Sequence, residues 1–116
     1  MHVLLCDDDA LLRAVVSDLL KELGHTVETA NDGNQTIEAL RNKPFDVALL
    51  DFLMPKKNGL EVLRELQTWP SRPRVIILSA ISPKTLPAIS EAKPDAVLEK
   101  PVKPKQLSKA LADVTR

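Results

Sequence analysis

The sequence is poor in cysteine and in aromatic residues: it contains one cysteine, one tryptophan and no tyrosine. The single cysteine, Cys6, excludes a disulfide bond within the chain. It lies in the apolar run of residues 3–6, so we interpret it as a small buried apolar residue. A chain without internal disulfides is typical of a reducing compartment, and we therefore predict a cytoplasmic location.

An excess of charge of either sign is also absent, because 16 basic residues balance 16 acidic ones. This balance gives no electrostatic footprint for nucleic acid or for an anionic membrane, and we expect neither as a direct partner. No apolar run approaches the roughly 20 residues of a membrane-spanning helix. The first strand pattern begins almost at Met1, so we expect no signal peptide. The length suits one domain, which we predict to span residues 1–116.

The sequence does contain an alternation of short apolar runs and amphipathic segments. The run from Val47 to Leu50 is apolar throughout, which is typical of a strand buried on both faces. We predict strands at residues 3–6, 25–30, 47–50, 74–78 and 96–98. We predict helices at residues 10–24, 36–42, 81–92 and 105–114, and one from Leu60 to the Trp69–Pro70 pair. This fivefold alternation indicates an α/β fold with helices on both faces of a parallel sheet.

The first predicted helix has a wide apolar face. Its main stripe contains Leu12, Val16, Leu19, Leu20 and Leu23. Leu11 and Val15 lie beside this stripe. We interpret the widened stripe as a broad core face, with a docking surface near the helix start as the alternative.

The fourth predicted helix is interrupted by prolines. Pro83 suits the first turn of a helix, but Pro87 cannot lie in a helix interior without the loss of a hydrogen bond. We therefore expect this helix to be short, late or kinked.

Chemically active side chains follow four of the five predicted strands. They are the run Asp7-Asp8-Asp9, Asp51, Ser79 and Lys100. Each has a simpler explanation as a helix cap, a turn residue or a surface charge. However, the carboxyl ends of parallel strands meet at one edge of the sheet, so the joint pattern is better explained by a single site.

The composition of this site favours phosphoryl transfer. Clustered carboxylates repel one another, and a hard divalent cation with oxygen ligands, such as Mg²⁺, relieves the repulsion. Lys100 and Ser79 offer an ammonium and a hydroxyl to the oxygens of an incoming phosphoryl group. We predict that Asp51 is the carboxylate that accepts this group.

Four motifs, VLLCDDD, LLDFLMPKKNG, VIILSA and LEKP, together resemble the receiver domain of two-component response regulators over essentially the whole chain. The resemblance implies a flavodoxin-like, doubly wound (βα)5 fold. It also implies a five-stranded parallel sheet with the strand order 2-1-3-4-5, as in the chemotaxis receiver.

The resemblance further implies a role for each site residue. Asp51 matches the phosphoacceptor, Ser79 the switch hydroxyl, and Lys100 the lysine of the family. The metal ligands would be Asp8 directly, Asp7 through a metal-bound water, Asp51, and the backbone carbonyl of Leu53. The cofactor would be Mg²⁺, with Mn²⁺ as a substitute, and the Lys100–Pro101 bond would be cis.

Resemblance to this family also implies partners. The phosphoryl donor would be a histidine kinase or a phosphotransfer protein. A downstream effector domain or protein would respond to the change in shape, and a phosphorylation-dependent dimer is a further option.

Two departures from the family pattern affect the signalling face, which is usually built from helix four, strand five and helix five. Family members usually carry Tyr or Phe three residues before the lysine, where this chain has Val97. The segment between Ser79 and Lys100 is also slightly short and holds Pro83, Pro87 and Pro94.

Two alternatives to a phosphoacceptor domain remain open. A Mg²⁺-dependent phosphohydrolase of the haloacid-dehalogenase type would carry an acid two residues after the nucleophile, where this chain has Leu53. A receiver-like module that binds partners without phosphorylation would have no need of clustered acids.

Overall fold

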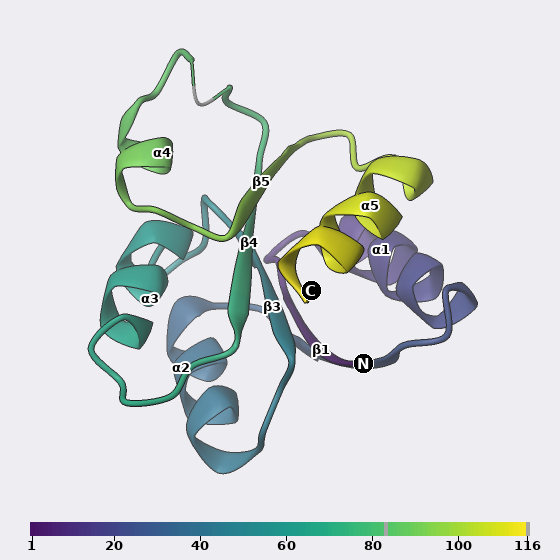
Figure 1. Cartoon of the computed structure of the whole chain (residues 1–116), viewed down its shortest axis with the longest axis horizontal. Coiled ribbons are helices and arrows are strands. Elements are labelled where there is room, and N and C mark those ends of the chain that lie inside the picture. The colour runs from purple at the N-terminus through teal and green to yellow at the C-terminus, as the bar shows by residue number, and fades with distance from the viewer. Residues whose placement is uncertain (83, 116) are drawn as a thin grey trace.

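A computed structural model describes residues 1–82 and 84–115. Its sheet has five parallel strands in the order β2-β1-β3-β4-β5, which confirms the predicted fold class (Figure 1). The strands are β1 (His2–Cys6), β2 (Thr26–Ala30), β3 (Val47–Asp51), β4 (Arg74–Ser79) and β5 (Ala96–Glu99). The helices are α1 (Ala10–Glu22), α2 (Gly33–Asn42), α3 (Gly59–Leu66), α4 (Ala88–Glu91) and α5 (Pro104–Val114).

Helices cover both faces of the sheet, α1 and α5 on one and α2, α3 and α4 on the other (Figure 1). Successive side chains of a strand point to opposite faces. In β3, Val47 and Leu49 therefore join the core beneath α1 and α5, while Ala48 and Leu50 join the core beneath α2 and α3. This double burial explains why the central strand is apolar at every position.

Side-chain caps fix the beginnings of the first three helices. Asp9 caps α1, Asp32 caps α2, and Asn58 forms a capping box with Glu61 at the start of α3. The predicted start of α2 at residue 36 was therefore three residues too late, because Asp32 already satisfies the amide of Gln35.

The interpretation of the wide α1 stripe as a core face was wrong at three positions. Leu11 is 75% exposed and Val15 51% exposed, whereas Val16 and Leu20 are buried against the sheet. Leu23, predicted to face the core, is 39% exposed as the residue that ends the helix. The sheet covers one edge of the apolar arc, where Val16 and Leu20 lie, and leaves the opposite edge, with Leu11 and Val15, exposed.

The fourth helix is short and late, as predicted. Pro87 precedes it at the N-cap position, and α4 spans only Ala88–Glu91, with Ile89 fully buried. The expectation about Pro83 lies outside the described residues. Among the helices of residues 1–82 and 84–115, none has the length and apolar character needed to cross a membrane.

Candidate functional site

The predicted site residues meet at the carboxyl edge of the sheet. Asp51 and Ser79 are the last residues of β3 and β4, while Asp7 and Lys100 directly follow β1 and β5. A pocket of about 260 Å³ opens there. Its lining residues are Asp7, Asp8, Asp9, Asp51, Phe52, Leu53, Ser79, Ala80, Ile81 and Lys100. Every residue of the predicted site therefore borders a single pocket.

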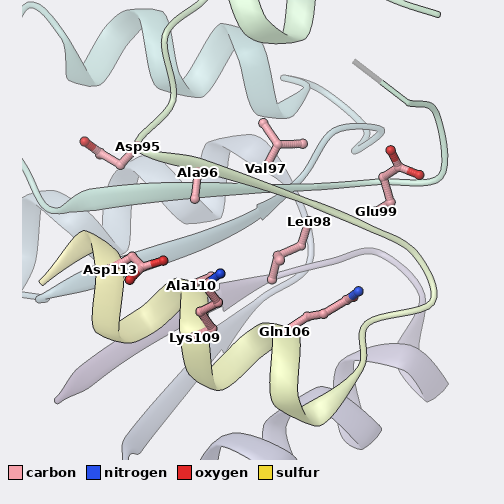
Figure 2. A pocket seen from close by; sticks show the side chains of 9 residues that line it. All are labelled: Asp95, Ala96, Val97, Leu98, Glu99, Gln106, Lys109, Ala110 and Asp113. Atoms are coloured by element: carbon pink, nitrogen blue, oxygen red, sulfur yellow. The ribbon is translucent and has the colours of Figure 1, made fainter. Parts of the chain in front are cut away.

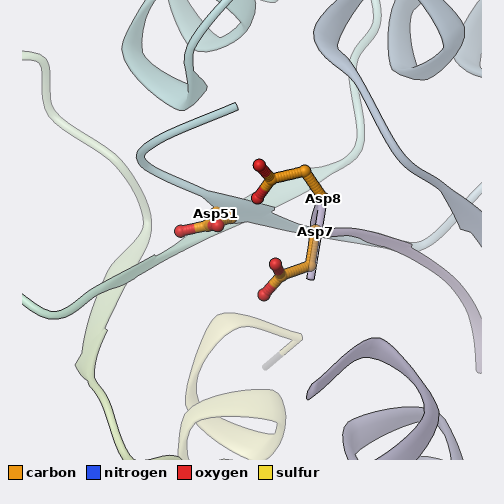
Figure 3. A group of neighbouring side chains, drawn as sticks. All are labelled: Asp7, Asp8 and Asp51. Atoms are coloured by element: carbon orange, nitrogen blue, oxygen red, sulfur yellow. The ribbon is translucent and has the colours of Figure 1, made fainter. Parts of the chain in front are cut away.

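Three carboxylates face one another in this pocket (Figure 3). Asp7, Asp8 and Asp51 each offer an oxygen, and these oxygens lie within 4.8 Å of one another. Asp7 and Asp51 are buried, while Asp8 is exposed at the mouth of the pocket. An all-oxygen donor set that is open on one side fits a hard cation which keeps several of its own waters.

Lys100 provides the positive charge opposite these acids. Its Nζ lies 3.0 Å from Oδ1 of Asp51 and 3.2 Å from Oδ2 of Asp7. Burial alone would lower the pKa of Lys100, but the hydrogen bonds and charges of Asp51 and Asp7 outweigh burial and raise it. The lysine is therefore held in its charged form between two carboxylates.

Asp51 is the carboxylate whose protonation the site alters most clearly. Burial raises the pKa of Asp51 to about 6, opposed by the hydrogen bond from Lys100 and reinforced by the charge of Asp7. The carboxyl is still largely ionised at neutral pH, which keeps it available as a nucleophile.

The loop between β1 and α1 is tied down by its own side chains. The amide of Asp9 donates to Oδ1 of Asp7, and the carboxylate of Asp9 accepts from the amides of Leu11 and Leu12. The capping alternative thus holds for Asp9, which leaves the exposed Asp8 outside the capping contacts.

Arg13 donates from Nη1 to the Asp7 carbonyl at 2.7 Å. Sequence reasoning missed Arg13, although its position one turn after Asp9 aims it back at this loop.

Ser79 combines the two interpretations that the sequence allowed. Its hydroxyl donates to the carbonyl of Ile81 at 2.8 Å and accepts from the amide of Ile81 at 2.9 Å. It is therefore a turn hydroxyl, and it also lines the acidic pocket. The Lys100–Pro101 bond after β5 is cis, as expected.

A second and larger pocket, of about 510 Å³, lies between β5 and α5 (Figure 2). Val97 and Leu98 of β5 and Gln106, Lys109 and Asp113 of α5 are among its lining residues. Among residues 1–82 and 84–115, the two pockets have no lining residue in common. Val97, where the family usually has an aromatic ring, also packs against the core beneath α2 and α3.

A parallel sheet in the order 2-1-3-4-5 with an acidic pocket at its carboxyl edge places the chain among the flavodoxin-like α/β proteins. Within that class, a family profile described as the response regulator receiver domain matches residues 3–112, and the chain belongs to this family. It is thus a receiver domain of two-component signalling, and receiver domains act as signalling domains.

Characterised relatives agree with this assignment. The sensory/regulatory protein RpfC of Xanthomonas campestris is 31% identical over 98% of this chain, and the match covers 16% of RpfC. The gliding motility regulatory protein of Myxococcus xanthus is 40% identical over 86% of this chain and 13% of its own length. The chain therefore spans only a small part of the length of these relatives.

Solved structures show the same fold. The chemotaxis response regulator CheY4 of Vibrio cholerae has a TM-score of 0.87 at 30% identity, with 97% of each chain covered. The receiver domain of the sensor histidine kinase PA1611 from Pseudomonas aeruginosa has a TM-score of 0.88 at 23% identity, with 99% of this chain and 98% of that one covered. In that structure a magnesium ion is coordinated in the active site cleft.

Proposed function

We propose that this receiver domain accepts a phosphoryl group on Asp51 and changes shape in response. The observation that carries the proposal is the position of Asp51, whose carboxylate lies 3.0 Å from Lys100 in an acidic pocket that opens to solution. The donor would be a histidine kinase or a phosphotransfer protein. A downstream effector domain or protein, or a second copy of the chain, would respond to the altered shape.

The residues present fit a bound Mg²⁺, with Mn²⁺ as a substitute. Asp7, Asp8 and Asp51 would hold it together with the backbone carbonyl of Leu53, which borders the same pocket. Hard oxygen donors of this kind suit Mg²⁺ better than softer metals. When bound, the cation would offset negative charge on the phosphoryl oxygens. The magnesium ion reported for the Pseudomonas relative supports the same assignment.

The transfer itself uses three residues of the chain. An oxygen of Asp51 forms a bond to phosphorus while the bond from phosphorus to the donor's imidazole nitrogen breaks, and the donor keeps that electron pair. Lys100 then donates to a phosphoryl oxygen in place of the Asp51 carboxylate. The Ser79 hydroxyl turns from Ile81 toward another phosphoryl oxygen. This rotation breaks both hydrogen bonds between the hydroxyl and the backbone of Ile81.

The exposed apolar residues near the pocket support a protein donor. Leu11 and Val15 lie on the first two turns of α1, just after the pocket residue Asp9, and Leu53 is 61% exposed at the pocket itself. The docking alternative for α1 is therefore the one we now favour. A partner that covers these side chains would also exclude water during transfer.

Phosphorylation can be measured directly by mass. After incubation with Mg²⁺ and acetyl phosphate, we expect the intact protein to gain one phosphoryl group, and Asp51→Asn to gain none. Asp46→Asn is the matched control, because Asp46 lies exposed just before the opposite end of β3 and should leave the reaction unchanged. A full-strength phosphorylated peak from Asp51→Asn would overturn the proposal.

A further inference from the structure

We propose that Gly33 is a positioning residue for the cation site, although it lies outside the acidic pocket. The absence of a side chain at Gly33 lets the β3–α3 loop, residues 52–58, dock against the start of α2. This docking fixes the Leu53 carbonyl, which is the proposed ligand from that loop. The inference rests on the proposed function, because it concerns how tightly that function's cation is held.

The contact between Gly33 and the loop leaves no room for a methyl group. A Cβ added at Gly33 would overlap the carbonyl oxygen and the Cβ of Lys57, and it would lie 2.8 Å from the Lys57 carbonyl carbon. Two of these three atoms belong to the backbone, so rotation of the lysine side chain cannot relieve the overlap. Either α2 or the loop would have to move.

The start of α2 is the more firmly fixed of the two. The fully buried Thr36 donates its hydroxyl to the Asp32 carbonyl at 2.8 Å, and the Asp32 side chain caps the amide of Gln35 at 2.8 Å. One turn later, Ile37 and Leu40 are buried in the core. A displacement of α2 would disturb all of these contacts together. Leu53, Pro55 and Lys56 of the loop are exposed, so the loop should move instead.

Contacts hold the loop on either side of Leu53, and the neighbouring Met54 is buried in the core. On the near side, the Gly59 amide donates to the Phe52 carbonyl at 2.9 Å. On the far side, the Gly33 amide donates to the Pro55 carbonyl at 3.3 Å, and Lys56 Nζ lies 3.5 Å from Oδ2 of Asp32. Only Met54 separates Leu53 from Pro55, so a shift of the backbone at Pro55 is transmitted to the Leu53 carbonyl through a single residue.

The test is a Mg²⁺ titration followed by backbone NMR on the intact chain. Gly33→Ala should shift the amide signals of residues 53, 54, 56 and 57 before any metal is added. It should also weaken Mg²⁺ binding by about tenfold or more, the usual effect of losing a contact that orients a metal ligand. Neither readout requires phosphorylation.

Gly24→Ala is the matched control for lost stability. Gly24 has φ +92° and nothing within 4 Å of an added Cβ, so alanine there strains the backbone without touching the loop. We expect this variant to melt at a lower temperature yet to bind Mg²⁺ as the parent does. Equal Mg²⁺ affinity in Gly33→Ala and the parent would overturn the inference.

A second variant decides the question if Gly33→Ala does not fold. Lys56→Met removes the ion pair with Asp32 and also a positive charge from the loop that carries Leu53. Loss of a positive charge alone would, if anything, tighten Mg²⁺ binding. Weaker binding by Lys56→Met would therefore support positioning, and equal or tighter binding would contradict it. If the parent itself binds no Mg²⁺, or binds it as tightly after Asp8→Asn, the proposed cation site fails and not merely the role of Gly33.

Discussion

The two sides of the acidic pocket differ in how firmly the fold holds them. On the acidic side, Asp7 and Asp51 are buried, and the loop after β1 is fixed by Asp9 and Arg13. On the other side, the described residues of the segment from 79 to 92, which we name the switch segment, form one short helix without a side-chain cap. Among the described residues of this segment, Ser79 and Ile89 are buried and the others are at least partly exposed.

We interpret this difference as a division between the proposed chemistry and the proposed signalling. A nucleophile and its metal ligands work best when neighbouring contacts hold them in place. A segment that must move is better built from few buried contacts, because it then rearranges at low cost. The acidic side has the first property and the switch segment the second, so we expect phosphorylation of one to be read out in the other.

The largest expected effect is on the free energy of unfolding, which the ionised Asp51 carboxylate lowers. Because burial raises the pKa of Asp51 from 3.8 to about 6, the ionised carboxylate opposes folding at neutral pH. Without metal, Asp51→Asn should raise the free energy of unfolding by about 1–2 kcal/mol, a figure that allows for solvent screening. Asp8→Asn should have a smaller effect, since Asp8 is exposed. Denaturant melts at pH 7 would measure both.

The same effect has a defined dependence on pH. Between about pH 4 and 6, Asp51 binds a proton in the folded state but not in the unfolded chain. The loss of folding stability caused by Asp51 therefore decreases as the pH falls through 6, and it is absent below the unfolded pKa of 3.8. The advantage of Asp51→Asn over the parent should shrink accordingly. Mg²⁺ should stabilise the parent more than either variant. A pH-independent difference, or none in either variant, would show that the fold imposes no such cost on the ionised Asp51 carboxylate.

A smaller effect is expected on the rate of phosphate loss from the pocket. Leu53 and Ile81 both border the pocket and are apolar, so neither can orient a water for attack on the phosphoryl group. Leu53→Asn should therefore lose phosphate several-fold faster, while Leu53→Met, which stays apolar, should match the parent. The decay of the phosphorylated intact mass gives both rates. Equal lifetimes in all three proteins would remove this explanation for a slow loss of phosphate.

The convergence of the site could be predicted from sequence because it follows from topology. Five strand–helix pairs require a parallel sheet, and a parallel sheet brings Asp51, Ser79 and Lys100 to one edge. The start of α2 could also have been predicted from the sequence, since Asp32 followed by Gln35 three residues later is a capping pattern.

Other features depend on distances that no local pattern contains. Helical spacing gives the width of the apolar arc on α1, but not which part of it the sheet covers, so the exposure of Leu11 and Val15 was missed. Gly33 looks like an ordinary turn glycine until the backbone of Lys57 is seen against it. Such contacts join segments far apart in sequence, and only the folded chain defines them.

We expect a phosphoryl group on the acidic side to rearrange the switch segment through Ser79, and backbone NMR tests this expectation directly. The test compares backbone NMR spectra of the parent, Ser79→Ala and Val97→Ala, each with and without Mg²⁺ and beryllofluoride as a phosphoryl mimic. Within the described residues, the hydroxyl of Ser79 joins the pocket to the backbone of Ile81 through two hydrogen bonds. Val97 is β-branched and too short to swing between surface and core.

We predict that the mimic shifts signals in residues 80–92 of the parent and of Val97→Ala. Ser79→Ala should still bind the mimic, with altered signals at Asp7, Asp8 and Asp51, but should lose most of the changes in residues 80–92. The opposite pattern, a responsive Ser79→Ala and a silent Val97→Ala, would contradict the account, because the relay would then run through β5.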